Sequence, residues 1–203
     1  MRLLSTLTIL TTLTLAQTFT PPILRRPFHA GPYPDTNQAA MSPSPDPSIS
    51  STQILSDILG LSKAISIFAS LTRDVSPVTA RLSTHDLNTT LLAPMNSAIT
   101  SLPRKPWEDP REYAAFGTEA YEGKDGEDRA ARNLRRFVEA HVVPVSPWEE
   151  KVRVKTLEGG EVWWEEDGEG IRRIYPGGVE VGNVGSSVGN GAVWILKGVL
   201  NYA

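Results

Sequence analysis

The sequence predicts an α+β domain, with helices at the front of the chain and antiparallel strands packed behind them as a sandwich or wedge. Three observations support this class. Apolar residues recur at helical spacing over residues 54–71, a strand, corner and short helix are expected over residues 88–102, and hydrophobicity alternates with period two from residue 151 onward. A chain of 203 residues is long enough for one domain with a substantial core.

The first sixteen residues have the composition of a secretory signal peptide. Arg2 precedes an apolar run, and small residues near Ala16 suit a cleavage site. An amphipathic anchor or a retained membrane segment is the alternative, although the run is short for a membrane span. After cleavage no transmembrane segment is expected.

Residues 17–50 contain eight of the sixteen prolines and few apolar side chains. Such a segment buries too little apolar surface to offset its ordering entropy, so it is expected to be a disordered linker. The folded domain is therefore expected over residues 51–203.

Two helices are expected before the first strand. The first ends at Gly60, and the second begins at Ser62 and ends at Pro77. Their expected inward-facing residues are Ile54, Leu55, Ile58, Leu59, Ile65, Phe68, Ala69 and Leu71.

Residues 89–93 are β-branched and apolar and predict a short strand. Pro94 lacks a backbone N–H and is expected to end the pairing, and Asn96 is then placed to cap a short helix. The sequence Asn-Thr-Thr at residues 88–90 makes Asn88 a candidate N-glycosylation site, provided that the chain is secreted.

Residues 103–128 are polar with scattered aromatic side chains, and are expected to form a long surface loop. A helix with an apolar inner face is expected over residues 129–141. Its opposite face carries Arg129, Arg132 and Arg136, a candidate surface for an anionic glycan or phospholipid head group. The alternative is an ordinary solvated helix face.

Antiparallel hairpins are expected from residue 151 onward, with turns at residues 159–160, 167–168 and 176–178. Residues 193–196 are almost continuously apolar, which is typical of a strand buried on both faces.

The alternation also predicts the register of the first hairpin. Its apolar side chains share one face only if the numbers of paired residues sum to an even value, because a one-residue slip turns every side chain over. The best such register pairs Val154 with Val162, places Arg153 against Trp163, and needs a loop of three or five residues with a glycine in the left-handed region. Trp164 is expected to be buried and Trp163 substantially exposed.

Three motifs together resemble the fasciclin domain. The first, T-L-L-A-P-x-N-x-A, covers residues 90–98; the second, H-V-V-P, follows a helix at residues 141–144; the third, N-G-x-V-x-I-x-x-G-V-L, covers residues 190–200. They occur in the order that the family has, over residues 52–202. Against the family pattern, the segment near 103–128 is an insertion, and Ala140 replaces a usual tyrosine. The family-motif residues are Pro94, Asn96, His141, Asn190, Gly191 and Gly198.

The resemblance implies a non-catalytic adhesion or interaction protein of the secretory pathway, at the cell surface, outside the cell or in a vacuole. Its partner would be a protein or a cell-wall or extracellular glycan. This step is an analogy from fold. One alternative is a lipid- or glycan-binding module with an apolar cavity. A less favoured one is a serine hydrolase using Ser187 in G-x-S-x-G, because a glycine-rich loop and a strand, not a helix, are expected there.

The composition narrows the function classes further. A net charge of −3 disfavours a nucleic-acid-binding protein, and the absence of cysteine excludes iron–sulfur and Cys-ligated zinc sites. No histidine pair has metal-ligand spacing, and no phosphate-binding glycine motif is present. No cofactor, metal or catalytic residue is therefore predicted, and His141 is expected to be a buried structural residue.

Overall fold

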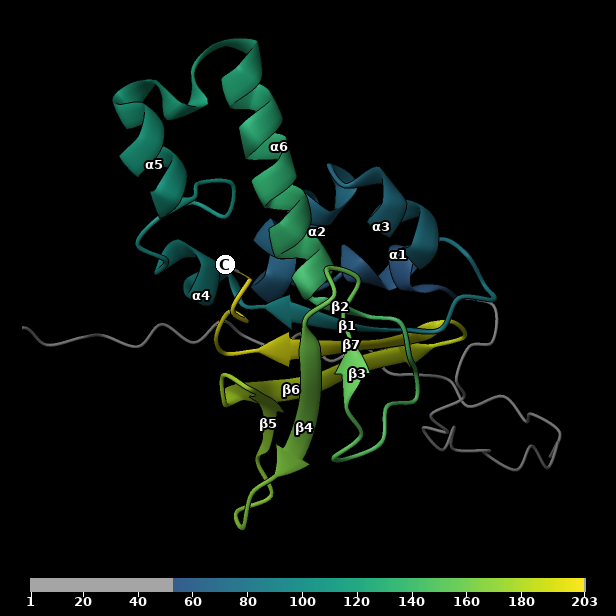
Figure 1. Ribbon diagram of the computed structural model, residues 1–203. Coiled ribbons are helices and arrows are strands. Elements are labelled where there is room, and N and C mark those ends of the chain that lie inside the picture. Colours follow the sequence, from purple (N-terminus) through teal and green to yellow (C-terminus); the bar gives the residue numbers. More distant parts are fainter. Residues whose placement is uncertain (1–52, 203) are drawn as a thin grey trace, which may run out of the picture. The chain divides into compact units, whose positions relative to one another are not determined.

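The structure, a computed structural model, describes residues 53–202. The expected signal peptide (residues 1–16), the expected linker (residues 17–50) and the first two residues of the expected domain lie outside the described residues. Within 53–202, helices pack on one face of a seven-stranded sheet, which gives an α+β domain as the sequence predicts (Figure 1).

The front of the domain contains three α-helices and a short 3₁₀ helix, where two helices were expected. Helix α1 ends just before Gly60, as predicted, but the second expected helix is divided. Pro77, expected to end a helix, is the second residue of a third one, because a proline without an N–H fits the first turn of a helix. The elements are α1 (Leu55–Leu59), the 3₁₀ helix η1 (Lys63–Ile65), α2 (Ser66–Arg73) and α3 (Ser76–Leu82).

The sheet is mixed, not purely antiparallel. Its strand order is β2-β1-β7-β6-β5-β4-β3, and all neighbours are antiparallel except β1 and β7. The first and last strands of the domain thus lie in parallel at its centre. The strands are β1 (Thr89–Pro94), β2 (Val142–Val143), β3 (Val154–Lys155), β4 (Glu161–Glu166), β5 (Arg172–Tyr175), β6 (Val179–Val188) and β7 (Gly191–Leu196).

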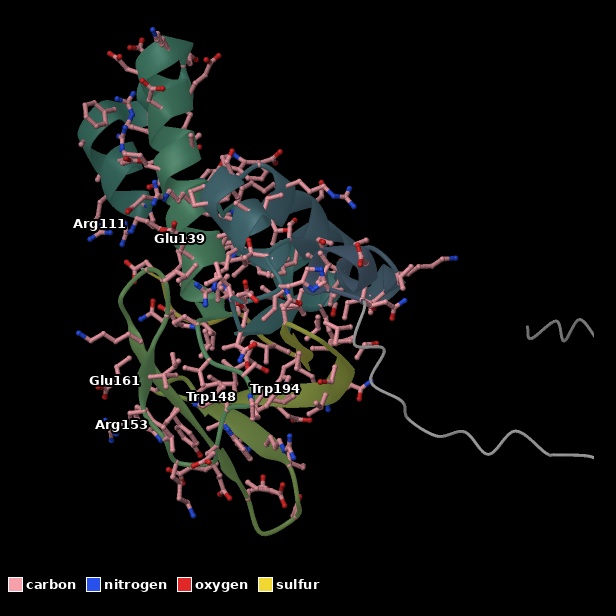
Figure 2. The ribbon with its side chains drawn as sticks, turned by 90° about the vertical axis from the view of Figure 1, so that its right-hand side faces the viewer. Arg111, Glu139, Trp148, Arg153, Glu161 and Trp194 are labelled. Atoms are coloured by element: carbon pink, nitrogen blue, oxygen red, sulfur yellow. The ribbon has the colours of Figure 1, made fainter. Side chains whose placement is uncertain are left out.

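Two hydrophobic cores lie on the two faces of β1 and β7. Successive side chains of a strand point to opposite faces, so Leu91 and Val193 pack under the helices while Leu92 and Trp194 enter the second core. The sheet curves round this second core, where the rings of Trp148 and Trp194 stack 5.6 Å apart (Figure 2). The prediction that β7 is buried on both faces is confirmed.

The predicted hairpin register is confirmed. Val154 pairs with Val162, and Lys155 pairs with Glu161. Gly159 in the connecting loop has a φ of 107°, a positive value that glycine tolerates. The β3–β4 ladder is only two pairs long, because the chain joins it at Val154, after Arg153.

One part of the hairpin prediction is wrong. Trp164 is buried as expected, but Trp163 is half-buried instead of substantially exposed. The guanidinium of Arg153 lies 4.1 Å from the Trp163 ring centre, as the register requires, and Tyr175 stacks on the same ring at 5.6 Å. The Tyr175 contact covers part of the Trp163 ring, and it comes from β5, whose position could not be predicted from the β3–β4 hairpin alone. Figure 2 shows Arg153 beside Glu161 on the outside of the sheet.

Residues 103–128 are mostly helical, so the expected surface loop is also wrong. Helix α4 (Asn96–Thr100) leads into α5 (Pro110–Phe116) and the 3₁₀ helix η2 (Gly117–Tyr121), and α6 (Gly123–Ala140) starts before the expected residue 129. The Asp109 carboxylate accepts a hydrogen bond from the Arg111 N–H, and Pro110 occupies the first turn. Figure 1 shows α5 beside the N-terminal half of α6, projecting away from the sheet.

Candidate functional site

His141 ends α6 and is completely buried. The Leu200 N–H donates to its Nε2 at 3.1 Å, so this nitrogen is unprotonated, and Nδ1 therefore carries the proton that bonds the Phe137 carbonyl at 2.7 Å. The rings of Phe68 and Phe137 pack against it. Burial lowers the pKa of His141 from 6.5 to about 4, so the ring is neutral at physiological pH. The expected structural role agrees with this geometry.

Asn190 joins three elements from a fully buried position. Its Oδ1 accepts from the Leu55 N–H at 2.8 Å, which caps the start of α1. Its Nδ2 donates to the carbonyls of Leu82 and Thr84, both at 3.0 Å, at the end of α3. These donor and acceptor assignments are fixed, because a backbone N–H only donates and a carbonyl only accepts.

Gly191, the next residue, has a φ of 152° and lies directly against the backbone of Thr89 in β1. A Cβ there would lie 1.9 Å from the carbonyl oxygen of Thr89, so only glycine lets β7 pair with β1 at this point.

Asn96 caps a helix, but not the one that the sequence suggests. The residue that precedes α4 is Met95, and the Asn96 side chain instead reaches the start of α2. Its Oδ1 accepts from the Ile67 N–H at 3.0 Å, and its Nδ2 donates to the Lys63 carbonyl at 2.8 Å. The expected N-cap of α4 is therefore wrong, and Asn96 holds α2 against the sheet-to-α4 corner.

Pro94 and Gly198 complete the motif residues. Pro94 is the buried last residue of β1 and pairs with Leu196. A Cβ on Gly198 would lie 3.2 Å from Val179. Among the motif residues, Asn96, His141 and Asn190 use their side chains to bridge backbone segments.

The candidate arginine face is divided by contacts within the domain. The Arg129 Nε donates to the Ala120 carbonyl at 2.7 Å, and its guanidinium lies over the Phe116 ring. Arg136 donates to the Tyr202 carbonyl at 3.1 Å. Arg132 is exposed. Two of the three arginines are therefore engaged in contacts within the domain, and only Arg132 of the three lies exposed on this face.

Asn88 lies in the exposed loop before β1, where its side chain can carry a glycan without entering a core. Its carbonyl accepts a hydrogen bond from Arg81 at 2.9 Å. The third residue of the sequon, Thr90, is buried, and its hydroxyl donates to the Val145 carbonyl at 2.6 Å.

Ser187 lies within β6, not in the glycine-rich loop expected before the last strand. It pairs with Ala192 of β7 beside an irregularity in the ladder. A nucleophile elbow turns from a strand into a helix, whereas this segment turns through Gly189 into another strand. The geometry of the elbow is absent from these residues.

The side chains between 53 and 202 contain no group of three or more carboxylate or imidazole residues placed to hold a metal ion. Within the same range, every helix is too short or too polar to cross a membrane.

A pocket of about 220 Å³, which sequence reasoning missed, opens between α5, α6 and Tyr202. Its wall is mostly carbon and includes Leu102, Pro103 and Pro110. Four charged residues also border it: Arg104, Glu108, Asp109 and Arg136. The signal in the sequence was the proline- and aromatic-rich composition of residues 103–113, which suggests local packing but not a cavity.

Comparison with known proteins identifies the family. The chain is 58% identical over 152 residues to a FAS1 domain-containing protein of Neurospora crassa, covering 74% of this chain and 66% of that protein. FAS1 domain-containing proteins of Aspergillus fumigatus and Emericella nidulans are 54% and 49% identical, over 73% and 72% of this chain and 64% and 61% of theirs. The chain thus spans just under two thirds of the length of these relatives. A scan of protein-family models found no match.

The fold agrees with this relationship. A solved FAS1 domain pair from the insect cell adhesion molecule Fasciclin I superposes with a TM-score of 0.50 at 12% identity, covering 74% of this chain and 51% of that one. The motifs around β1, His141 and β7, the fungal relatives and this structural match lead to one conclusion: the chain belongs to the fasciclin (FAS1) domain family.

Proposed function

We propose that this chain is a non-catalytic adhesion or interaction protein of the secretory pathway, acting at the cell surface, outside the cell or in a vacuole. The observation that carries the proposal is the use of the motif side chains. The polar groups of Asn96, His141 and Asn190 form hydrogen bonds with the backbone and are not available to a ligand. This supports a function that depends on the surface of the domain.

Membership of the FAS1 family supports the same function by analogy, since the solved relative belongs to a cell adhesion molecule. The partner would be a protein or a cell-wall or extracellular glycan. In this proposal residues 1–16 act as a cleaved signal peptide, and Asn88 carries an N-linked glycan.

Localisation of the full chain with a C-terminal tag in a fungal host tests the secretory route. We expect the tag in the secretory pathway or outside the cell, with a mobility shift on glycosidase treatment that Asn88→Gln abolishes. A cytosolic protein with no shift would refute the secretory part of the proposal.

Adhesion is tested with beads that carry the purified chain. We expect these beads to bind fungal cells or isolated cell wall more strongly than beads that carry an unrelated protein of similar charge. Arg132→Glu examines the arginine face without disturbing the contacts of Arg129 and Arg136. Unchanged retention of this variant on an anionic glycan would remove the arginine face from the proposal, and absence of bead binding would refute adhesion itself.

A further inference from the structure

We propose that the pocket between α5, α6 and Tyr202 binds a single-chain amphiphile with an anionic head group. This site does not depend on the adhesion function, because it is argued from the pocket alone. Its apolar wall, its two arginines and the rigidity of its frame each restrict the ligand.

The wall favours an apolar body. Leu102, Pro103, Pro110 and the ring of Tyr202 present carbon to the cavity, and long arginine stems cover further apolar surface. A concave apolar surface open to water is typical of a ligand site. The volume of about 220 Å³ lies below the ~300–1,000 Å³ usual for drug-sized ligands, which suits one short alkyl chain better than a two-tailed lipid.

Both carboxylates at the rim have hydrogen-bond partners, but only Asp109 is paired with a cation. Asp109 forms an ion pair with Arg111 at 2.8 Å, and this contact holds the pKa of the Asp109 carboxyl below its usual range. Glu108 accepts from the Lys105 N–H at 3.0 Å and from the Tyr113 hydroxyl at 3.3 Å.

The two arginines at the rim differ in their contacts. Arg104 lies over the Tyr113 ring at 4.6 Å and forms no ion pair with any residue in the described part of the chain. Arg136 donates to the Tyr202 carbonyl at 3.1 Å, and its nearest carboxylate, that of Glu158, lies at 3.8 Å. With Asp109 paired to Arg111, the two arginines outnumber the one remaining rim carboxylate, Glu108, so the rim keeps a net positive charge that a carboxylate or phosphate complements.

The frame of the pocket is formed before any ligand arrives. Asn133 of α6 is buried, and its Nδ2 donates to the Glu112 carboxylate of α5 at 2.7 Å and to the Trp107 carbonyl at 3.1 Å. The Tyr121 hydroxyl donates to the same Glu112 oxygen at 2.7 Å. These bonds fix α5 against α6, so little ordering cost remains to be met on binding.

Isothermal titration of the full chain with decanoate, dodecanoate, dodecyl phosphate, dodecanol and dodecyltrimethylammonium, all below their micellar concentrations, tests the proposal. We expect both anions to bind, and dodecanoate to bind about tenfold more tightly than decanoate, since each buried methylene contributes about 0.8 kcal/mol. Tighter binding of dodecanoate assigns the site to fatty acids, and tighter binding of dodecyl phosphate assigns it to phosphate esters. Equal or tighter binding of dodecanol or the ammonium compound would overturn the assignment.

Arg104→Gln should weaken dodecanoate binding about tenfold or more, because it removes a charged hydrogen-bond donor. Arg104 is exposed, so the variant should keep the melting temperature of the parent. Arg132→Gln, on the exposed side of α6, is the matched control and should bind as the parent does. Equal loss in both variants would refute a role for Arg104. Dodecanoate should also shift the side-chain amide resonance of Asn133; an unmoved resonance with binding retained would place the ligand elsewhere and overturn the proposal.

Discussion

Lowering the pH from 7 to 5 is expected to weaken the fold through the imidazole of His141. The ring is neutral in the folded state because its Nε2 accepts the Leu200 N–H, and protonation would place a donor against that donor. Burial depresses the pKa of His141 from 6.5 to about 4. Between these values the unfolded chain binds a proton and the folded chain does not, so the stability is fully present above pH 6.5 and falls as the pH drops toward 4.

The size of the effect follows from the two pKa values. The depression is 6.5 − 4 = 2.5 units, which corresponds to about 3 kcal/mol over the whole titration. Over the narrower step from pH 7 to pH 5 the expected loss in the free energy of unfolding is about 2 kcal/mol. Asp109 and Asp167, whose pKa values lie below 3.8, lose their contributions only at lower pH and do not contribute in this window.

Urea denaturation at both pH values measures the loss, and His141→Gln provides the control. Glutamine retains an acceptor for the Leu200 N–H but does not titrate. The variant should be less stable than the parent at pH 7, because the Phe137 carbonyl loses its donor, yet its free energy of unfolding should be nearly constant between pH 7 and 5. A parent protein with equal stability at both pH values, or a variant with the same loss, would refute the buried neutral imidazole.

Two further predictions concern the joint between the helices and β7. Gly191→Ala should prevent folding or cost at least about 3 kcal/mol, because its Cβ would overlap the Thr89 carbonyl. The control Gly168→Ala, whose Cβ would have no atom within 4 Å, should change the melting temperature little. A melting temperature for Gly191→Ala within a degree or two of the parent would contradict the β1–β7 pairing. Asn190→Ala should cost about 3 kcal/mol in urea denaturation, because the buried Leu55 N–H and Leu82 carbonyl and the part-buried Thr84 carbonyl all lose its side chain as a partner. The exposed control Asn183→Ala should be nearly neutral, and equal midpoints for both variants would exclude the capping role.

Local patterns in the sequence determined the elements whose signals are short-range. The alternation on either side of Gly159 required Val154 opposite Val162, because any odd register would bury charge. The strand at β1 and the doubly buried β7 follow from composition in the same way. The three motifs, read in order, were enough to indicate the FAS1 fold and to single out His141 as structural.

Tertiary structure decided which backbone groups the motif asparagines bind. Asn96 is a residue type that often caps the helix that follows it, but its side-chain oxygen accepts a hydrogen bond from the Ile67 N–H, 29 residues away. Asn190 likewise caps a helix that starts 135 residues earlier. A capping side chain is recognisable from sequence, but its partner depends on which helix end the fold brings within about 3 Å.

The pocket shows the same limit for function. Residues 103–128 lack a strong apolar period, and hydrogen bonds of Asn133, Glu112 and Tyr121 connect their helix α5 to α6. Arg104 and Arg136, 32 positions apart, then border one cavity with Tyr202 from the end of the domain. Helix propensity and charge are local properties that a sequence carries, whereas a cavity exists only where distant segments pack and leave space between them.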